Sequence, residues 1–359
     1  MSASDARTLG QLLILGLRDH RWSSSLERTL RTLQPGGVLF SPGCFRTPGQ
    51  TVELLHRIAR ELSTTPFLAL TEEGGSVNPL KALLPPLPAP RVLTCRGPSA
   101  VQRSGELMGN ALRLLGCNLN FAPRLDLSNP DVEPALDTQT FGTDPKHVAT
   151  CGKAFIEGLR TPKILAGAKH FPGRSVPEHN EGGLPLVGKS MAELWREDML
   201  PFRGLLPQLP MILMSNAAYK AYDFDHPRPA SLSRQIITGL LRVKLAYRGL
   251  TLAYDLAATA ARGGLDFGEA VIAAATAGCD LMLADQEESI EIGRRSLEAA
   301  LASGKLLPER VEESISRIRA GQKGLRRPSG KLSARSFDRL AREFEEFSHQ
   351  VRAGGEIEA

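Results

Sequence analysis

The sequence predicts an α/β protein built as a single (β/α)8-type TIM barrel. Apolar, strand-like runs alternate with helical patterns along most of the 359 residues, which is typical of β-α units around a parallel sheet. The runs are continuous, as expected for strands buried on both faces. Their number alone does not distinguish a closed barrel from an open doubly wound sheet, but their spacing favours the barrel. The sequence also lacks a G-x-G-x-x-G or P-loop motif, which weighs against a nucleotide-binding sheet.

The elements follow one another in a regular order. The predicted strands are residues 36–40, 67–71, 118–122, 164–171, 211–215, 250–254 and 280–284. The predicted helices are residues 52–62, 99–115, 146–159, 192–206, 234–244, 266–277, 297–302 and 308–323. We expect residues 1–325 to form the barrel. Residues 326–359 are charged, with a helical stretch near 336–351, and we expect a helical tail rather than a second domain.

Composition excludes several classes of protein. The formal net charge is +5, from 44 basic and 39 acidic residues, and no aromatic interleaving accompanies the basic residues, so a nucleic-acid partner is not expected. No apolar stretch reaches roughly 18 residues, so no membrane span is expected. The polar N-terminus does not resemble a signal peptide. We therefore expect a cytoplasmic protein, and the sequence does not indicate its oligomeric state.

The five cysteines do not suggest a disulfide framework or a zinc site. Their number is odd and none forms a C-x-x-C pair, so reduced thiols packed as small apolar groups are expected. We expect no metal and no cofactor.

Polar clusters follow five of the predicted strands, where a parallel barrel carries its chemistry. They are Thr71-Glu72-Glu73, Arg124 with Asp126, Lys169-His170, Ser215-Asn216 and Tyr254-Asp255. A loop over residues 172–185 adds Glu178, His179 and Glu181. Because five clusters lie at five strand ends, we predict a pocket at that end of the barrel.

These residues resemble glycoside hydrolase family 3. The run Lys169-His170-Phe171-Pro172-Gly173 is similar to the K-H-F-P-G signature of that family. Further ordered similarities lie at Leu9 to Leu13, Glu73-Gly74-Gly75, Asn120 to Pro123 with Asp126, Thr140 to Pro145, Pro229 to Ser233, and Ala277 to Leu281. The subgroup most similar is the single-domain bacterial β-N-acetylglucosaminidases of peptidoglycan recycling.

The resemblance implies a retaining β-N-acetylhexosaminidase that cleaves a β-linked amino sugar or related glycoside during cell-wall sugar recycling. Its nucleophile would be an Asp at a strand end. In an alignment without gaps, the nucleophile position falls on Tyr254. Asp255 takes that position only after a local shift of one residue, and such a shift turns each side chain to the opposite face of the strand unless a β-bulge accommodates it. We take Asp255 as the candidate nucleophile, with Tyr254 lining the pocket.

The resemblance also implies an acid/base on the mobile loop, where the subgroup has D-S-H. Here the aligned residues are His179-Asn180-Glu181, so the order of carboxylate and imidazole is reversed. Either His179 or Glu181 could protonate a leaving oxygen, since a neighbouring carboxylate raises the pKa of an imidazole.

Sugar contacts are implied for seven residues: Glu73, Asp126, Gln139, Lys169, His170, Asn216 and Tyr254. The family's D-Q-E-G-G-R turn reads Thr71 to Ser76 here. The Arg of its G-x-R-S-F-G segment is Gln139, and the His after the fifth strand's Ser is Asn216.

Two readings of function stay open at this point. The first is an O-glycosyl hydrolase acting on a small carbohydrate. The second is a catalytically inactive barrel that binds a sugar or a protein partner, because the scaffold motifs are kept while the charged motifs have changed. A lyase or phosphorylase is a third, weaker reading that no metal cluster or phosphate loop supports.

Overall fold

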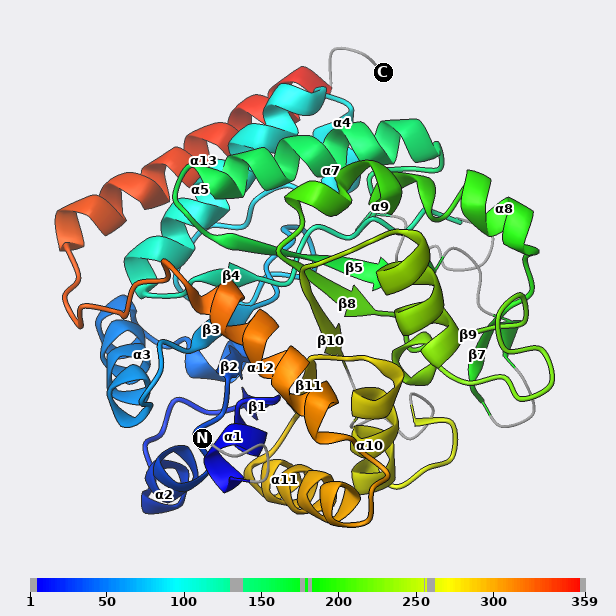
Figure 1. Ribbon diagram of the computed structural model, residues 1–359. Coiled ribbons are helices and arrows are strands. Elements are labelled where there is room, and N and C mark those ends of the chain that lie inside the picture. Colours follow the sequence, from blue (N-terminus) through cyan, green and yellow to red (C-terminus); the bar gives the residue numbers. More distant parts are fainter. Residues whose placement is uncertain are drawn as a thin grey trace.

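Eight parallel strands close into a barrel in the computed structural model, which describes residues 5–129, 138–174, 178–179, 183–254, 256 and 262–355. The strands are β1 (Leu13–Leu17), β2 (Gly37–Phe40), β3 (Phe67–Leu70), β4 (Leu119–Asn120), β5 (Leu165–Phe171), β8 (Met211–Met214), β10 (Leu250–Ala253) and β11 (Leu281–Ala284). They pair in chain order and β1 closes the ring against β11 (Figure 1). The predicted TIM barrel is confirmed.

Helices surround the strands (Figure 1). They are α1 (Ala6–Gly10), α2 (Ser24–Leu33), η1 (Pro42–Cys44), α3 (Pro48–Glu61), α4 (Pro90–Thr94), α5 (Pro98–Leu115), α7 (Pro145–Arg160), α8 (Met191–Arg196), α9 (Leu200–Leu205), η2 (Leu206–Gln208), η3 (Ala230–Leu232), η4 (Gln235–Lys244, a π-helix), α10 (Phe267–Ala277), α11 (Glu287–Ala302), α12 (Pro308–Gln322) and α13 (Ala334–Gly355). No helix among the described residues is both long enough and apolar enough to cross a lipid bilayer.

Local sequence explains where these helices begin. The Asp144 carboxylate accepts from the backbone N–H groups of Lys146 and His147, and Pro145 occupies the first turn of α7, where its missing N–H costs nothing. At α10, Asp266 and Glu269 form a reciprocal capping box. Such caps satisfy N–H groups that have no partner within the helix.

Several expectations about elements were incomplete. Helix α2 was not predicted, and the helix predicted over 297–302 begins ten residues earlier, at Glu287 of α11. The seven predicted strands omit β1, because apolar residues run unbroken from Leu12 to Leu15 directly after α1, and such a run does not distinguish a strand from a buried helix. The helix predicted over 192–206 is divided into α8 and α9, since α8 ends at Arg196 and Pro201 starts the first turn of α9.

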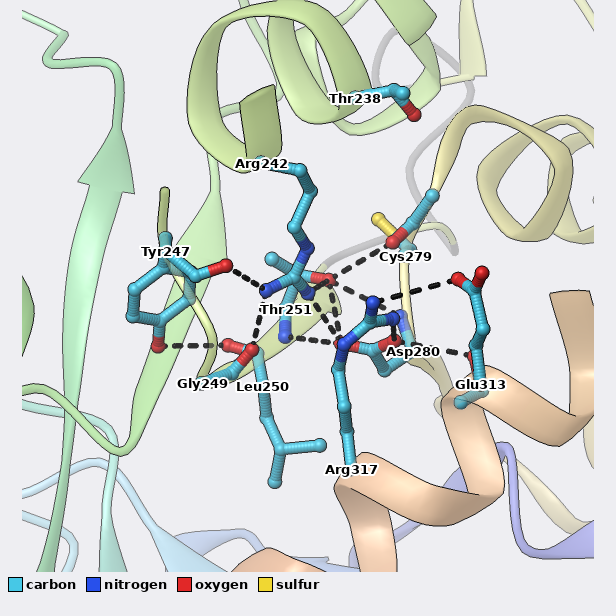
Figure 2. A network of polar contacts seen from close by, with 12 residues as sticks. Thr238, Arg242, Tyr247, Gly249, Leu250, Thr251, Cys279, Asp280, Glu313 and Arg317 are labelled. Carbon is cyan, nitrogen blue, oxygen red and sulfur yellow. Dashed lines mark hydrogen bonds and ion pairs between the residues drawn. The ribbon is translucent and has the colours of Figure 1, made fainter. Parts of the chain in front are cut away.

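The strand starts are covered by α12, which is held by a buried carboxylate. Asp280, which is fully buried just before β11, accepts from Arg242 at 2.6 Å, Arg310 at 2.9 Å and Arg317 at 3.0 Å (Figure 2). Arg242 lies on η4 and the other two arginines on α12. The Thr251 hydroxyl of β10 adds a contact of 3.1 Å. One side chain therefore ties two helices to the start of the barrel.

The last helix packs on the barrel's outer layer. Helix α13 lies beside α5 (Figure 1) and buries Phe337, Leu340 and Phe344. Arg103 of α5 pairs with Glu343 of α13 at 3.0 Å. A charged helical segment is confirmed within 326–359, while a division of the chain at residue 325 stays a prediction.

Candidate functional site

The predicted clusters lie along one arc of the barrel mouth. They follow β3, β4, β5, β8 and β10, and these five strands are consecutive neighbours in the closed sheet. Because all strands are parallel, the ends of neighbouring strands meet at one rim. The convergence predicted from sequence is confirmed for the positions that the structure describes.

An ion pair links the ends of β3 and β5. The Lys169 ammonium contacts the Glu73 carboxylate, and both side chains are almost completely buried. Burial lowers the pKa of Lys169 below its usual 10.5, while Glu73 opposes that shift. A buried ion pair contributes little net stability, but loss of one partner costs about 3–5 kcal/mol because the other charge stays buried. The two residues therefore fix each other's position.

A second pair joins the residues after β4 to the end of β5. Asp126 accepts from the backbone N–H groups of His170 and Arg174, each at 3.0 Å, and its second oxygen lies 2.7 Å from His170 Nδ1. Burial opposes the charged carboxylate, but the His170 imidazole and the Arg124 guanidinium outweigh it and hold the pKa of Asp126 at about 2.

Burial also lowers the pKa of His170 below its usual 6.5. The neutral imidazole then donates from Nδ1 to Asp126, which leaves Nε2 as an acceptor. Asp126 thus fixes both the orientation and the tautomer of His170.

Local backbone geometry lets adjacent residues of β5 reach different partners. The pairing of β5 with β8 shifts register between Lys169 and Phe171, and such a shift interrupts strict alternation of side chains. Gly173 follows with φ of 112°, and a Cβ there would lie 2.6 Å from the Cβ of buried Asp198. Only glycine fits this position without displacing its neighbour.

Glu72, at the end of β3, is a buried carboxyl group. Its Oε1 accepts from the Gly74 N–H at 3.0 Å, and Oε2 has no hydrogen-bond partner among the described residues. Burial, reinforced by Glu73, raises its pKa to about 8, so Glu72 is mostly protonated at neutral pH. The Asn120 amide holds the Glu72 backbone through contacts of 2.9 and 2.8 Å.

Gln139 lies against the turn that follows β3. When the side-chain amide of Gln139 is oriented so that both of its polar atoms have partners, its nitrogen donates to the Gly74 carbonyl at 3.2 Å. Its oxygen then accepts from the Ser76 hydroxyl at 2.9 Å and from the Ser76 N–H at 3.0 Å. Gln139 is buried. Its polar atoms support the turn, and its predicted contact with substrate stays a prediction.

Asn216 and Tyr254 complete the arc. Asn216 follows β8 and is half-buried, and its Oδ1 has no hydrogen-bond partner among the residues that the structure covers. The Tyr254 ring, after β10, meets Phe121 edge-on with centroids 6.1 Å apart. Phe121 follows β4, which two strands separate from β10, so this contact crosses the barrel mouth. The Tyr254 ring therefore extends across the barrel mouth, and its role in lining a pocket there stays a prediction.

The loop predicted to carry the acid/base joins a small sheet beside the rim. In it β6 (Glu178–His179) pairs with β7 (Pro185–Val187), which pairs with β9 (Ala218–Tyr219). The backbone of His179 is thereby placed opposite Pro185. Asp255 and Glu181 lie outside the described residues, so the structure does not test their roles.

Sequence analysis did not anticipate two features of the site. Arg174 binds Asp126 through its backbone N–H, a contact that no residue type signals. The neutral state of Glu72 depends on burial, which the polar cluster alone does not show. Within the described ranges, no three His, Cys, Asp or Glu side chains are grouped to hold a metal ion.

Comparisons with known proteins agree on one family. Residues 6–320 match the glycosyl hydrolase family 3 N-terminal domain. A beta-hexosaminidase of Pseudomonas aeruginosa is 30% identical over 303 residues, which cover 83% of this chain and 88% of that protein.

Solved structures share the fold. A family 3 beta-N-acetylglucosaminidase from a Paenibacillus species superposes with a TM-score of 0.83 and 25% identity, covering 96% of this chain and 68% of that one. A fungal multi-domain family 3 beta-N-acetylglucosaminidase superposes with a TM-score of 0.90 at 21% identity. The match covers 96% of this chain and 42% of that one, and shows the fold alone.

Proposed function

Since the chain belongs to glycosyl hydrolase family 3, we propose that it is a β-N-acetylhexosaminidase-like enzyme that hydrolyses a β-linked amino sugar or related glycoside with retention of configuration. The substrate class is that of the activity for which its relatives are named, beta-hexosaminidase and beta-N-acetylglucosaminidase. Turnover of cell-wall sugars is the process that fits such a substrate.

The observation that carries the proposal is the pair of buried contacts at the ends of β3, β4 and β5. Lys169 with Glu73, and His170 with Asp126, present fixed charged and polar atoms at the mouth of the barrel. Sugar hydroxyls both donate and accept, so they suit such a mixed array, and preorganised partners lose little entropy on binding. Asn216 adds an acceptor that has no partner among the described residues.

The proposed chemistry has two steps. The Asp255 carboxylate attacks the anomeric carbon and forms a covalent glycosyl-enzyme, while His179 or Glu181 protonates the departing oxygen. The same loop residue then takes a proton from water, which attacks the anomeric carbon and releases Asp255. Loop closure over the mouth would bring the acid to the bond. Lys169 and His170 hold the sugar, and Tyr254 covers its face.

Hydrolysis of p-nitrophenyl β-N-acetylglucosaminide, beside a panel of other p-nitrophenyl glycosides, tests the proposal. We expect turnover that Asp255→Asn abolishes and Tyr254→Phe spares. Separate His179→Ala and Glu181→Gln variants identify the acid, because loss of the acid spares substrates with good leaving groups. Turnover that requires inorganic phosphate would indicate a phosphorylase. No turnover on any sugar by folded protein would favour the inactive barrel that binds a sugar or a partner.

A cytoplasmic location is part of the proposal. All five cysteines are free thiols, and four of them are buried. Free thiols persist most readily in a reducing compartment. Fractionation of cells that express the tagged chain tests this, and recovery outside the cytoplasm would contradict it.

A further inference from the structure

A cavity lies at the opposite end of the barrel from the candidate active site. It has a volume of about 880 Å³ and is lined by residues within 156–166, 206–210, 245–249 and 323–325, which we call the strand-start pocket. Ala166 near the start of β5 lines this pocket, whereas Lys169 and His170 at the end of the same strand serve the candidate active site. The volume lies within the usual range for small-molecule sites, roughly 300–1,000 Å³.

The charged residues of the strand-start pocket all have the same sign. They are Arg160, Lys163, Arg248 and Lys323, and the lining contains no Asp or Glu. All four are exposed. None of them makes an ion pair with a residue that the structure describes, whereas the three arginines around nearby Asp280 are all paired. The positive charge at this rim is therefore not balanced by an ion-pair partner within the described part of the chain.

The floor of the strand-start pocket is apolar. Ile164, Leu206 and Leu209 line it and are at most 8% exposed. The Tyr247 hydroxyl, also buried there, already donates towards the carbonyls of Leu209 and Leu250. The floor thus favours an apolar group, and the charged groups are confined to the rim.

We propose that the strand-start pocket binds a small amphipathic anion, with its apolar body on the floor and its anionic head among the four rim cations. Charge complementarity sets the sign of the head, and the apolar floor sets the character of the body. The proposal does not rest on glycoside hydrolysis, because the pocket shares no residue with the candidate active site.

Decanoate is a suitable probe, measured by isothermal titration calorimetry on the full chain. We expect decanoate to bind, while decyltrimethylammonium, with the same tail and the opposite charge, and acetate, with the head alone, bind at least tenfold more weakly. Equal binding of decanoate and decyltrimethylammonium would overturn the proposal, as would no decanoate binding up to millimolar concentration. These comparisons need no variant.

Two variants locate the binding. Reversal of two rim charges in Lys163→Glu/Arg248→Glu is expected to weaken decanoate binding by about tenfold, since each partly exposed ion pair contributes only modestly to affinity. Gln208→Trp fills the pocket without a change of charge and is expected to abolish binding. The control Lys146→Glu, at the other end of α7, should leave binding unchanged. Circular dichroism melting curves confirm that each variant is folded.

The same samples distinguish a second copy of the chain as the occupant. A dimer in sedimentation velocity that Gln208→Trp dissociates, together with absent decanoate binding, would assign the pocket to a subunit interface and overturn the proposal. Decanoate binding that the double charge reversal and Gln208→Trp leave unchanged would place the probe elsewhere and would overturn it as well.

Discussion

Replacement of Glu72 by Gln should stabilise the protein near neutral pH and remove a large part of its pH dependence. The Glu72 carboxyl is 4% exposed, and burial raises its pKa to about 8 from the usual 4.5. The folded protein therefore retains a proton that the unfolded chain releases. Between pH 4.5 and 8 the free energy of unfolding falls as pH rises, because the folded state binds more protons there.

The magnitude follows from the size of the shift. Each pKa unit corresponds to about 1.4 kcal/mol, so Glu72 lowers stability by about 3 kcal/mol at pH 7 and by about 5 kcal/mol once the pH passes 8. Glu72→Gln keeps the volume and the oxygen that accepts from Gly74, but does not titrate. The variant should match the wild type near pH 4.5 and exceed it by those amounts at higher pH.

Urea denaturation followed by circular dichroism, at half-unit steps from pH 4.5 to 8.5, measures the difference. Glu53→Gln, on the exposed face of α3, is the matched control and should stay within about 0.5 kcal/mol of the wild type. A difference between Glu72→Gln and wild type that does not change with pH would refute the reasoning, because it would mean that Glu72 is ionised in the folded protein.

Three other changes test the charged networks by the same denaturation assay. Asp280→Asn should lower the free energy of unfolding by about 3–5 kcal/mol, because it leaves three arginines around a neutral group. The control Asp285→Asn, which removes a surface ion pair, should lower it by at most about 1 kcal/mol, and equal losses would contradict the importance of the Asp280 network. Lys169→Met should lower the free energy of unfolding by about 3–5 kcal/mol, and the double variant Lys169→Met/Glu73→Gln should lower it by clearly less, because no unpaired charge stays buried. A loss in the double variant equal to the sum of the single losses would mean that the two residues do not interact. The low pKa of Asp126 contributes about 2 kcal/mol of stability above pH 3.8, and this contribution is lost as pH falls towards 2. Asp126→Asn should remove that slope between pH 4 and 2, and a wild-type slope equal to the variant's would count against the low pKa of Asp126.

The barrel could be predicted because its strands are apolar on both faces and polar residues follow them directly. All seven predicted strands are present. The missing strand, β1, shows the limit of the method, since the short apolar run from Leu12 to Leu15 does not by itself distinguish a strand from a buried helix. The division between α8 and α9 was missed because apolar spacing continues across the break that precedes Pro201.

The placement of the candidate site residues at strand ends could be predicted, but not the contacts between them. Glu73 and Lys169 are 96 residues apart in sequence (169 minus 73), and their contact depends on β3, β4 and β5 being neighbours in the closed sheet. The ends of the strands can be recognised in the sequence, whereas contacts between side chains of different strands depend on the order and register of those strands in the barrel. The protonation of Glu72 likewise depends on burial, which a polar cluster does not reveal.

The changed residues at the turn after β3 are consistent with a site adapted to a different substrate. The resemblance implies Arg at the positions of Ser76 and Gln139, and both are neutral here. With its amide suitably oriented, buried Gln139 bonds to exposed Ser76 through both the hydroxyl and the N–H of that residue, so the two replacements are hydrogen-bonded to each other. Relative to the pattern that the resemblance implies, the rim lacks two positive charges, and we therefore expect a substrate with fewer anionic contacts on that side.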